Sequence, residues 1–180
     1  GYIAPSLFGP VGEAIAETRR RFPEAALEIL EAAPARQIDL LQQGKIDVAF
    51  LGHCSHSFSD RLEFLPLYRI PLAAVLPSNH ILAQSDSLSL IQLSRETFLG
   101  LKEELFPGRQ AIVARICEES GFQITYGQLA DSLISLLSLI GHGQGVSLVP
   151  QDASSIAHPQ VRFVPLENKT AEIRFHAAHR

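Results

Sequence analysis

One local pattern occurs twice in this chain: an apolar helix, then a glycine, then a short apolar run. The first copy covers residues 38–51, with Gly44 after the helix and the run 48–51 behind it. The second copy covers residues 131–149, with Gly141 and Gly143 after the helix and the run 146–149 behind them. Glycine can adopt the left-handed conformation that ends a helix, and an unbroken apolar run is typical of a parallel strand covered on both faces. The pattern therefore predicts an α/β fold.

The remaining elements fit the same class. Helical spacing of apolar residues predicts helices at about 10–22, around Ile91 and at 109–119. Strands are expected at 1–4, 26–32, 62–67, 72–76, 98–101, 123–126, 162–166 and 172–178. This order leaves open either one doubly wound sheet or two lobes. Because the first half lacks enough strands to complete a sheet, we expect the tail to return to it. The first lobe is then 1–71 with 150–180, and the second lobe is 72–149.

Composition restricts the class of protein. With 46% apolar residues the chain can bury a sizeable core, and no apolar stretch is long enough to span a bilayer. The net charge of −4 and the lack of a dense basic block argue against nucleic-acid binding by this chain itself. The run 19–21 is basic, but cations suit the last turn of a helix. We expect a soluble cytoplasmic protein with reduced thiols and no membrane partner.

Ligands of open α/β sheets bind beyond the carboxyl ends of the strands. If two lobes face each other, the loops that follow the strands line one cleft, and several of them lead into helices whose free N–H groups suit a carboxylate or other small anion. The candidate ligand-binding residues on these loops are Ser6, Phe8, Pro34, Gly52, His53, Pro77, Leu101, Lys102 and Ala130. Ser6 could equally be a turn or cap residue, and Lys102 could be only solvated.

Neither a metal site nor an active site is indicated. Residues 53–56 read His-Cys-Ser-His, but a fourth ligand and a recognised zinc spacing are lacking, so we expect no metal and no cofactor. A triad would need Ser6, His53 and Asp47 together, whereas Asp47 begins its strand and should lie at the opposite end from the other two. We therefore expect a binding protein with no catalytic residues.

The order of several short motifs is more specific than any one of them. The chain reads Gly-Tyr-Ile-Ala-Pro-Ser at 1–6, Arg-Phe-Pro-Glu at 21–24, Gly-Lys-Ile-Asp-Val-Ala-Phe at 44–50, Val-Leu-Pro-Ser-Asn-His at 75–80 and Gly-Val-Ser-Leu-Val-Pro at 145–150. In this order they resemble the effector-binding domain of LysR-type transcriptional regulators, over essentially all 180 residues. The resemblance implies two Rossmann-like α/β lobes joined by two crossover segments, the type II periplasmic-binding-protein architecture.

The resemblance also implies a function. A small, anionic metabolite would bind in the cleft between the lobes, with a hydroxyl such as that of Ser6 in contact with it, and would change how separate DNA-binding domains sit on an operator. Nothing precedes Gly1 where the family has its winged helix-turn-helix, so we expect DNA contacts only through a part absent from this chain. A solute-binding protein of a transporter and an enzyme on the same fold are the alternatives.

Self-association is a further implication of the resemblance. In the family the first helix and second strand of one subunit lie against a helix of the other lobe in its partner, giving homodimers and, for full-length proteins, homotetramers. The equivalent apolar positions here are Val11, Ile15, Leu27, Ile29, Ile112 and Ile116. Packing within each lobe would explain the same six residues.

Overall fold

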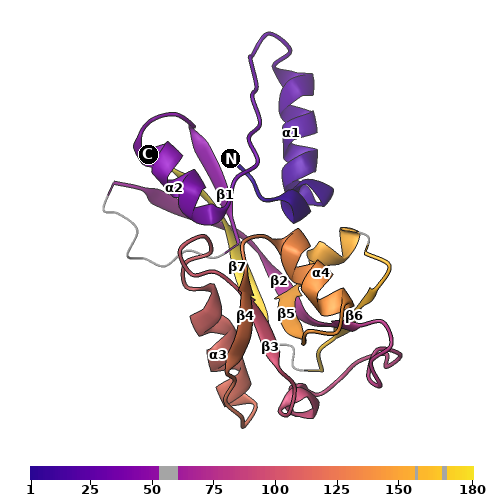
Figure 1. Cartoon of the computed structure of the whole chain (residues 1–180). Coiled ribbons are helices and arrows are strands. Elements are labelled where there is room, and N and C mark those ends of the chain that lie inside the picture. Colours follow the sequence, from indigo (N-terminus) through magenta and orange to yellow (C-terminus); the bar gives the residue numbers. More distant parts are fainter. Residues whose placement is uncertain (53–60, 157, 168–169) are drawn as a thin grey trace.

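The computed structural model of the protein describes residues 1–52, 61–156, 158–167 and 170–180. Its central feature is one long strand, β2 (Glu63–Pro77), which runs through both halves of the molecule (Figure 1). Residues 63–71 of β2 pair antiparallel with β7 (Glu172–His179), whereas residues 72–77 pair with β5 (Ser147–Pro150) and β6 (Val161–Pro165). The segments 62–67 and 72–76, predicted as separate strands, are therefore one continuous strand.

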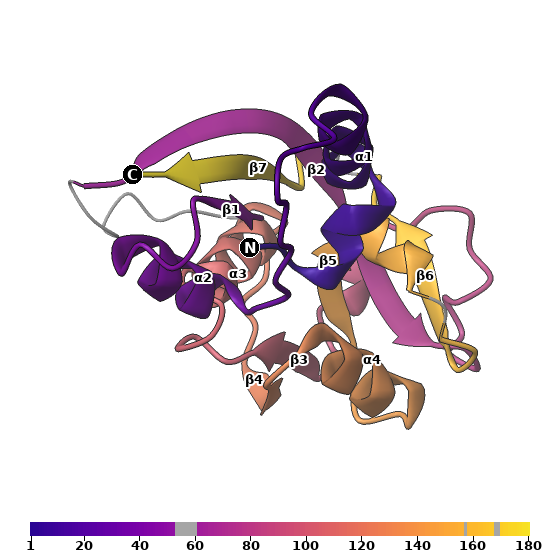
Figure 2. The ribbon, with the colours of Figure 1, turned by 90° about the horizontal axis from the view of Figure 1, so that it is seen from above.

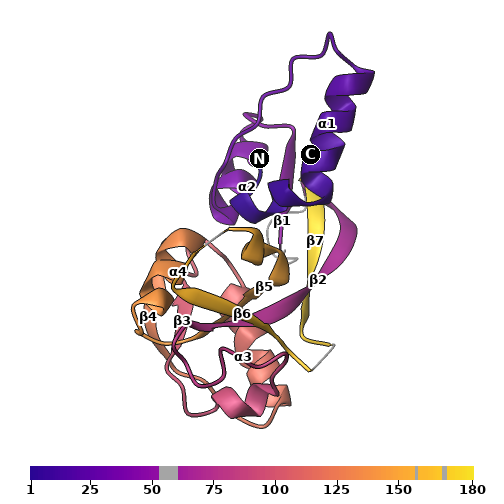
Figure 3. The ribbon, with the colours of Figure 1, turned by 90° about the vertical axis from the view of Figure 1, so that its right-hand side faces the viewer.

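The first lobe contains β1 (Val48–Leu51), α2 (Pro34–Gln42) and the end of β7. The buried face of α2 packs on β1, where Ile38 and Leu41 meet Ala49 and Leu51 in a small core. A short 3-10 helix, η1 (Ala4–Phe8), leads into α1 (Pro10–Arg21). Figures 1 and 3 show α1 and the segment after it projecting away from the rest of the molecule.

Two predicted strands of this lobe, 1–4 and 26–32, are wrong as regular strands. Only Tyr2 and Glu31 form an isolated parallel bridge, in which the Tyr2 N–H donates to the Leu30 carbonyl at 3.0 Å. The first segment turns into η1 after Ile3, and the second belongs to the projecting part of the chain until its last residues. Neither therefore keeps a strand partner along its length.

The strand β1 also differs from the prediction of a parallel strand covered on both faces. It pairs antiparallel with β7, with Val48 opposite His179 and Leu51 opposite His176, and Val48 is exposed. Figure 2 shows β7 lying beside β2, so that the C-terminal strand fills the position between β1 and β2. The partner of β1 thus comes from the end of the chain, which the local sequence of β1 does not specify.

The second lobe holds β3 (Phe98–Leu101) and β4 (Tyr126–Ala130), which pair in parallel, with α3 (Arg109–Glu119), α4 (Leu133–Gly141) and the 3-10 helices η2 (Leu90–Leu93) and η3 (Gln151–Ser155). All four residues of β3 are buried. The strand predicted at 123–126 lies at 126–130 instead. Residues 121 and 122 instead follow the C-terminal cap of α3, where the Phe122 N–H donates to the Cys117 carbonyl at 3.1 Å.

The glycine stops behave as predicted in both copies of the pattern. Gly44 has φ 68° and follows α2, and Gly143 has φ 74° and follows α4. Gly141 is the last residue of α4 and is not left-handed. The two helix ends therefore rely on one left-handed glycine each.

The lobe boundaries 1–71 with 150–180 and 72–149 stay a prediction, on which the strand pairing bears. Residues 150–180 were expected to return to the first lobe, and β7 pairs there with β1 and with residues 63–71. The strand β6 pairs instead with residues 73–77, at the end of β2 that also carries β5. We propose that the second lobe extends to β6 and that the return crossing lies between β6 and β7. Of the helices in the described ranges, none is long and apolar enough to cross a membrane.

Candidate functional site

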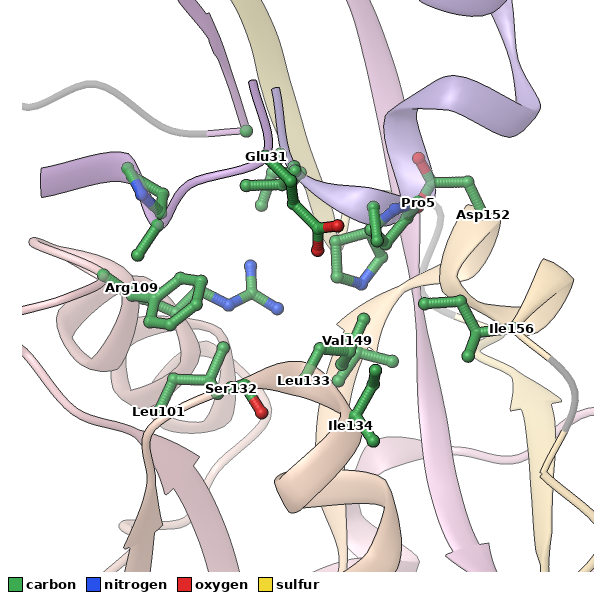
Figure 4. Close-up of a pocket in the computed structure, with 18 of the residues that line it drawn as sticks. Pro5, Glu31, Leu101, Arg109, Ser132, Leu133, Ile134, Val149, Asp152 and Ile156 are labelled. Atoms are coloured by element: carbon green, nitrogen blue, oxygen red, sulfur yellow. The ribbon is translucent and has the colours of Figure 1, made fainter. Parts of the chain in front are cut away.

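A cavity of about 440 Å³ lies between the two lobes. Its first-lobe side is formed by the start of η1, by residues 31–34 and by Gly52. Its second-lobe side is formed by Leu101, by residues 106–107 and 109, by 131–134 and by the end of β5 with the residues behind it. Figure 4 shows side chains from both sides directed toward one another across this space. A cavity at this position can respond to a relative movement of the lobes.

Most of the cavity wall is apolar. Ile70 comes from β2, which runs through both lobes, and Ile173 and Phe175 come from β7, which pairs with it; all three belong to the largest buried core. Leu101 and Val149 belong to the second core, around α4. Such walls are held by core packing and suit a ligand with an apolar body, whose orientation is then set by a few polar groups.

Arg109 is the most unusual of these polar groups. Arg109 is the first residue of α3 and follows Gly108, which has φ 78°. Nη2 of Arg109 donates to the Leu148 carbonyl at 2.9 Å. Its Nη1 is buried and has no hydrogen-bond partner among the described residues. Burial lowers the pKa of Arg109 to about 10, so the group still carries its charge at neutral pH. Figure 4 shows the guanidinium pointing into the cavity.

Asp152 lies on the other side of the cavity, in the first turn of η3 behind β5. Its Oδ1 is buried and, within the described part of the chain, has no hydrogen-bond partner. Burial raises the pKa of Asp152, against the backbone N–H groups of Ala153 and Asp152 and the charge of Arg109, which lower it. The cavity thus holds two incompletely paired groups of opposite charge.

Three further polar side chains line the cavity. Glu31 is exposed, and Figure 4 shows its carboxylate directed into the space. Asp131 forms an ion pair of 2.5 Å with Lys102, which raises the pKa of Lys102. The Ser132 hydroxyl caps α4 by accepting from the Ser135 N–H at 3.1 Å. Since Asp131 and Ser132 already have partners, Arg109, Asp152 and Glu31 are the groups best placed to meet a ligand.

Three of the predicted ligand-binding residues line the cavity: Pro34, Gly52 and Leu101. They lie where the strand-end rule places them, at the start of α2 and at the ends of β1 and β3. His53 lies outside the described residues.

Five other predicted residues do not line the cavity. The Ser6 side chain is buried and donates to the Ile3 carbonyl at 2.8 Å, while Phe8 is exposed. Pro77 ends β2, which runs antiparallel to β5, so this strand end points away from the cavity. Ala130 is buried in the second core, and Lys102 is paired with Asp131.

The charged cavity residues that sequence reasoning missed are Arg109, Asp152 and Glu31. Asp152 follows the carboxyl end of β5, so the strand-end rule covers it, although we applied that rule only to other strands. Arg109 comes one residue after a left-handed glycine, a position that does not by itself predict burial. Glu31 is directed into the cavity by the isolated bridge to Tyr2, which has no local sequence signal.

No group of three or more His, Cys, Asp or Glu side chains that could hold a metal ion occurs within the described ranges. The His-Cys-Ser-His stretch at 53–56, which we weighed as a zinc site, lies outside them.

Comparison with known proteins identifies relatives of this chain. The family described as LysR substrate binding domain matches residues 4–180. The Hca operon transcriptional activator HcaR of Escherichia coli (strain K12) is 27% identical over 86% of this chain and 52% of its own length. The HTH-type transcriptional regulator CatR of Pseudomonas putida is 30% identical over 92% of this chain and 56% of its own length. The chain thus spans about half the length of the curated relatives that it matches.

A solved structure supports the same relationship. The effector-binding domain of BenM, determined with its effector benzoate, superimposes on this chain with a TM-score of 0.82 at 26% sequence identity. The match covers 100% of this chain and 81% of the BenM domain. The two-lobed type II periplasmic-binding-protein architecture expected from the sequence is thereby confirmed.

Proposed function

Because this chain belongs to the LysR substrate binding domain family, we propose that it senses a small anionic effector in the cavity between its lobes and so modulates transcription. The family is one of transcription regulators and not of enzymes. The DNA contacts of the whole regulator would be made by a separate helix-turn-helix domain, as the names of the HTH-type relatives suggest.

The observation that carries this proposal is the Arg109 guanidinium inside an otherwise largely apolar cavity. A buried cation without a full set of partners is costly, and a carboxylate can supply the missing hydrogen bond together with the opposite charge. Benzoate, the effector named for the BenM domain, combines one carboxylate with an apolar ring. The cavity of this chain offers complementary features on its walls, the Arg109 guanidinium and an apolar surface.

Binding between lobes provides a physical route to regulation. An effector that contacts both sides binds one relative arrangement of the lobes better than another, and it shifts the population by that difference in affinity. The strand β2 runs through both lobes and supplies Ile70 to the cavity wall, and β7, which pairs with it, supplies Ile173 and Phe175. A change at the cavity therefore acts on β2, the strand that both lobes share.

The experiment that tests this function screens small metabolites, including benzoate, for stabilisation of the chain against thermal unfolding. A ligand at a hundred times its Kd adds about 2.7 kcal/mol, which for a chain of this size raises the Tm by roughly 5–11 °C. In Ile134→Trp an indole is placed at the cavity wall, at a position whose side chain is 61% exposed and can therefore be enlarged. We expect this variant to lose most of the ligand-induced shift.

Ile81→Trp is the matched control, because Ile81 is 89% exposed and does not line the cavity. Its ligand-induced shift should equal that of the wild type. The proposal is wrong if stabilising ligands act equally on Ile134→Trp and are then located outside the cavity by crystallography.

We also propose that the chain associates with a second copy of itself. Of the six residues predicted for the interface, Val11 and Ile116 are buried in the core and cannot contact a partner, while Ile15 and Ile112 are partly buried against that core. The projecting segment after α1 is better suited than these four residues to contact a second copy of the chain. Its exposed apolar side chains are Phe22 (61% exposed), Ile29 (44%) and Leu30 (45%), with Leu27 partly exposed among them.

Sedimentation velocity at micromolar concentration tests this association. Ile29→Glu should convert a dimer into a monomer, since a charge within a self-complementary apolar patch is introduced twice by two-fold symmetry. Ile81→Glu changes an exposed isoleucine elsewhere and should leave the sedimentation coefficient unchanged. A wild-type monomer, or a dimer that Ile29→Glu does not weaken, contradicts the proposed interface.

A further inference from the structure

Two buried side-chain atoms that lack a hydrogen-bond partner among the described residues belong to the wall of the same cavity, and one is a donor while the other is an acceptor. Nη1 of Arg109 is a donor on a cation, and Oδ1 of Asp152 is an acceptor on a carboxylate. Arg109 begins α3 and Asp152 follows β5, so each is held by a separate element of the second lobe. Buried polar groups in native proteins are nearly always hydrogen-bonded, and two such exceptions in one cavity indicate a ligand that satisfies both.

The two groups do not satisfy each other. No ion pair forms between Arg109 and Asp152 within the described residues, although the positive charge of Arg109 acts to lower the pKa of Asp152. The rotation of Arg109 toward Asp152 is opposed by its bond to the Leu148 carbonyl, at 2.9 Å. The backbone N–H groups of Asp152 and Ala153 hold the carboxylate of Asp152 in the same way. Both groups are thus preorganised on the cavity wall.

The balance of charge in the cavity decides between classes of anion. Arg109 supplies one positive charge, and Asp131 is paired with Lys102. Asp152 and Glu31 are two acids that form no ion pair within the part of the chain that the structure describes. The single carboxylate of a monoanionic ligand can therefore pair with the Arg109 guanidinium. The second carboxylate of a dianion would face Asp152 or Glu31 and be repelled.

We propose that the effector is a small monocarboxylic acid with an apolar body and a separate hydrogen-bond donor, a hydroxyl or an ammonium group. Its carboxylate binds Arg109, and its donor binds Asp152. This inference rests on the proposed function and specifies the chemistry of the same site. A charge-assisted hydrogen bond is about twice as strong as a neutral one, so both contacts contribute to selectivity as well as affinity.

Isothermal titration calorimetry of the chain with matched probes tests the inference. The probes are benzoate, the three hydroxybenzoates, the three aminomethylbenzoates, terephthalate as a dianion and methyl benzoate as a neutral ester. At least one hydroxyl or aminomethyl isomer should bind about tenfold or more tightly than benzoate, since each good polar contact is worth about that factor. Terephthalate and methyl benzoate should bind more weakly than benzoate.

Two variants assign the contacts. Arg109→Gln should weaken every monocarboxylate about tenfold or more and leave methyl benzoate unchanged. Asp152→Asn keeps the shape of the side chain and should leave benzoate unchanged, while the advantage of the best hydroxyl or aminomethyl isomer falls to less than about threefold. Arg162→Gln, on the exposed side of β6, is the matched control and should behave as the wild type.

Several outcomes would overturn the inference. They are the absence of binding by every carboxylate probe, equal binding of terephthalate and benzoate, or an unchanged preference in Asp152→Asn. If Arg109→Gln does not fold, Arg109→Lys retains the charge and should still favour benzoate over its methyl ester. A neutral or purely cationic compound that fills the cavity would remove this inference and the anionic character of the effector, and would leave effector sensing in the cavity standing. Loss of the proposed function requires that stabilising ligands act equally on Ile134→Trp and lie outside the cavity.

Discussion

Gln37 holds the first-lobe side of the cavity in place. Its side chain lies in α2, is fully buried and connects two backbone segments: Nε2 donates to the Ala32 carbonyl at 2.8 Å, and Oε1 accepts from the Phe50 N–H at 3.2 Å. The Phe50 N–H also donates to the Gly1 carbonyl at 2.9 Å and so keeps a partner if Gln37 is shortened. The substitution Gln37→Ala therefore leaves chiefly the Ala32 carbonyl unsatisfied.

The expected loss follows from these contacts. A buried carbonyl without a partner costs about 1–3 kcal/mol, and the loss of the two side-chain carbons beyond Cβ costs about 1 kcal/mol or slightly more. Gln37→Ala should therefore lower the free energy of unfolding by about 3 kcal/mol. For a chain of this length that corresponds to a fall in Tm of roughly 6–12 °C. Because residues 31–34 line the cavity, ligand binding should weaken in parallel.

Urea unfolding followed by circular dichroism measures the loss. Gln37→Leu refills the volume without the hydrogen bonds and should recover only the packing part, about 1 kcal/mol. Gln43→Ala, at the exposed end of the same helix, should change the free energy of unfolding by less than about 0.5 kcal/mol. A Gln37→Ala protein as stable as Gln43→Ala would refute the reasoning.

Three further outcomes are expected. Gly145→Ala should lose about 2 kcal/mol or more in urea unfolding, well beyond Gly143→Ala, because both have positive φ but only at Gly145 would a Cβ lie 2.3 Å from the Thr97 carbonyl oxygen. Burial raises the pKa of the Cys117 thiol to about 12, so in a Cys54→Ser background Cys117 should react with Ellman's reagent only after unfolding; rapid reaction of the folded protein would contradict this. Because folding raises the pKa of Asp152, the folded protein binds the carboxyl proton of Asp152 more tightly than the unfolded chain does. Stability should therefore fall as pH rises from the ordinary aspartate pKa through the raised value, and equal slopes in wild type and Asp152→Asn would exclude this.

The helices were predictable from the sequence to within a few residues, and so was the class of the fold. Apolar spacing marks α1, α3 and α4, and the left-handed Gly44 and Gly143 end two helices at the expected places. These features depend on backbone hydrogen bonds and conformational preferences within a few residues of one another. The strand-end rule likewise located Pro34, Gly52 and Leu101 on the cavity wall.

Other features depend on segments far apart in the chain, and here prediction failed in specific ways. The direction of β1 depends on β7, whose Ala178 pairs with Ala49. Ser6 was predicted to contact the ligand, yet its hydroxyl is bonded to Ile3, and the local sequence permits either outcome. Pro77 was misplaced because the orientation of β2 relative to β5 had to be known first.

The sequence by itself determined that this chain is an α/β protein of the LysR effector-binding type, because helix stops, apolar runs and their order are local properties read along the chain. Tertiary structure alone decided what the cavity contains. Arg109 and Asp152 line it together because α3 and η3 are positioned by separate strands, and their burial without full hydrogen bonding exists only once the lobes have formed. The chemistry of a site between two lobes is a property of their juxtaposition, which no single segment specifies.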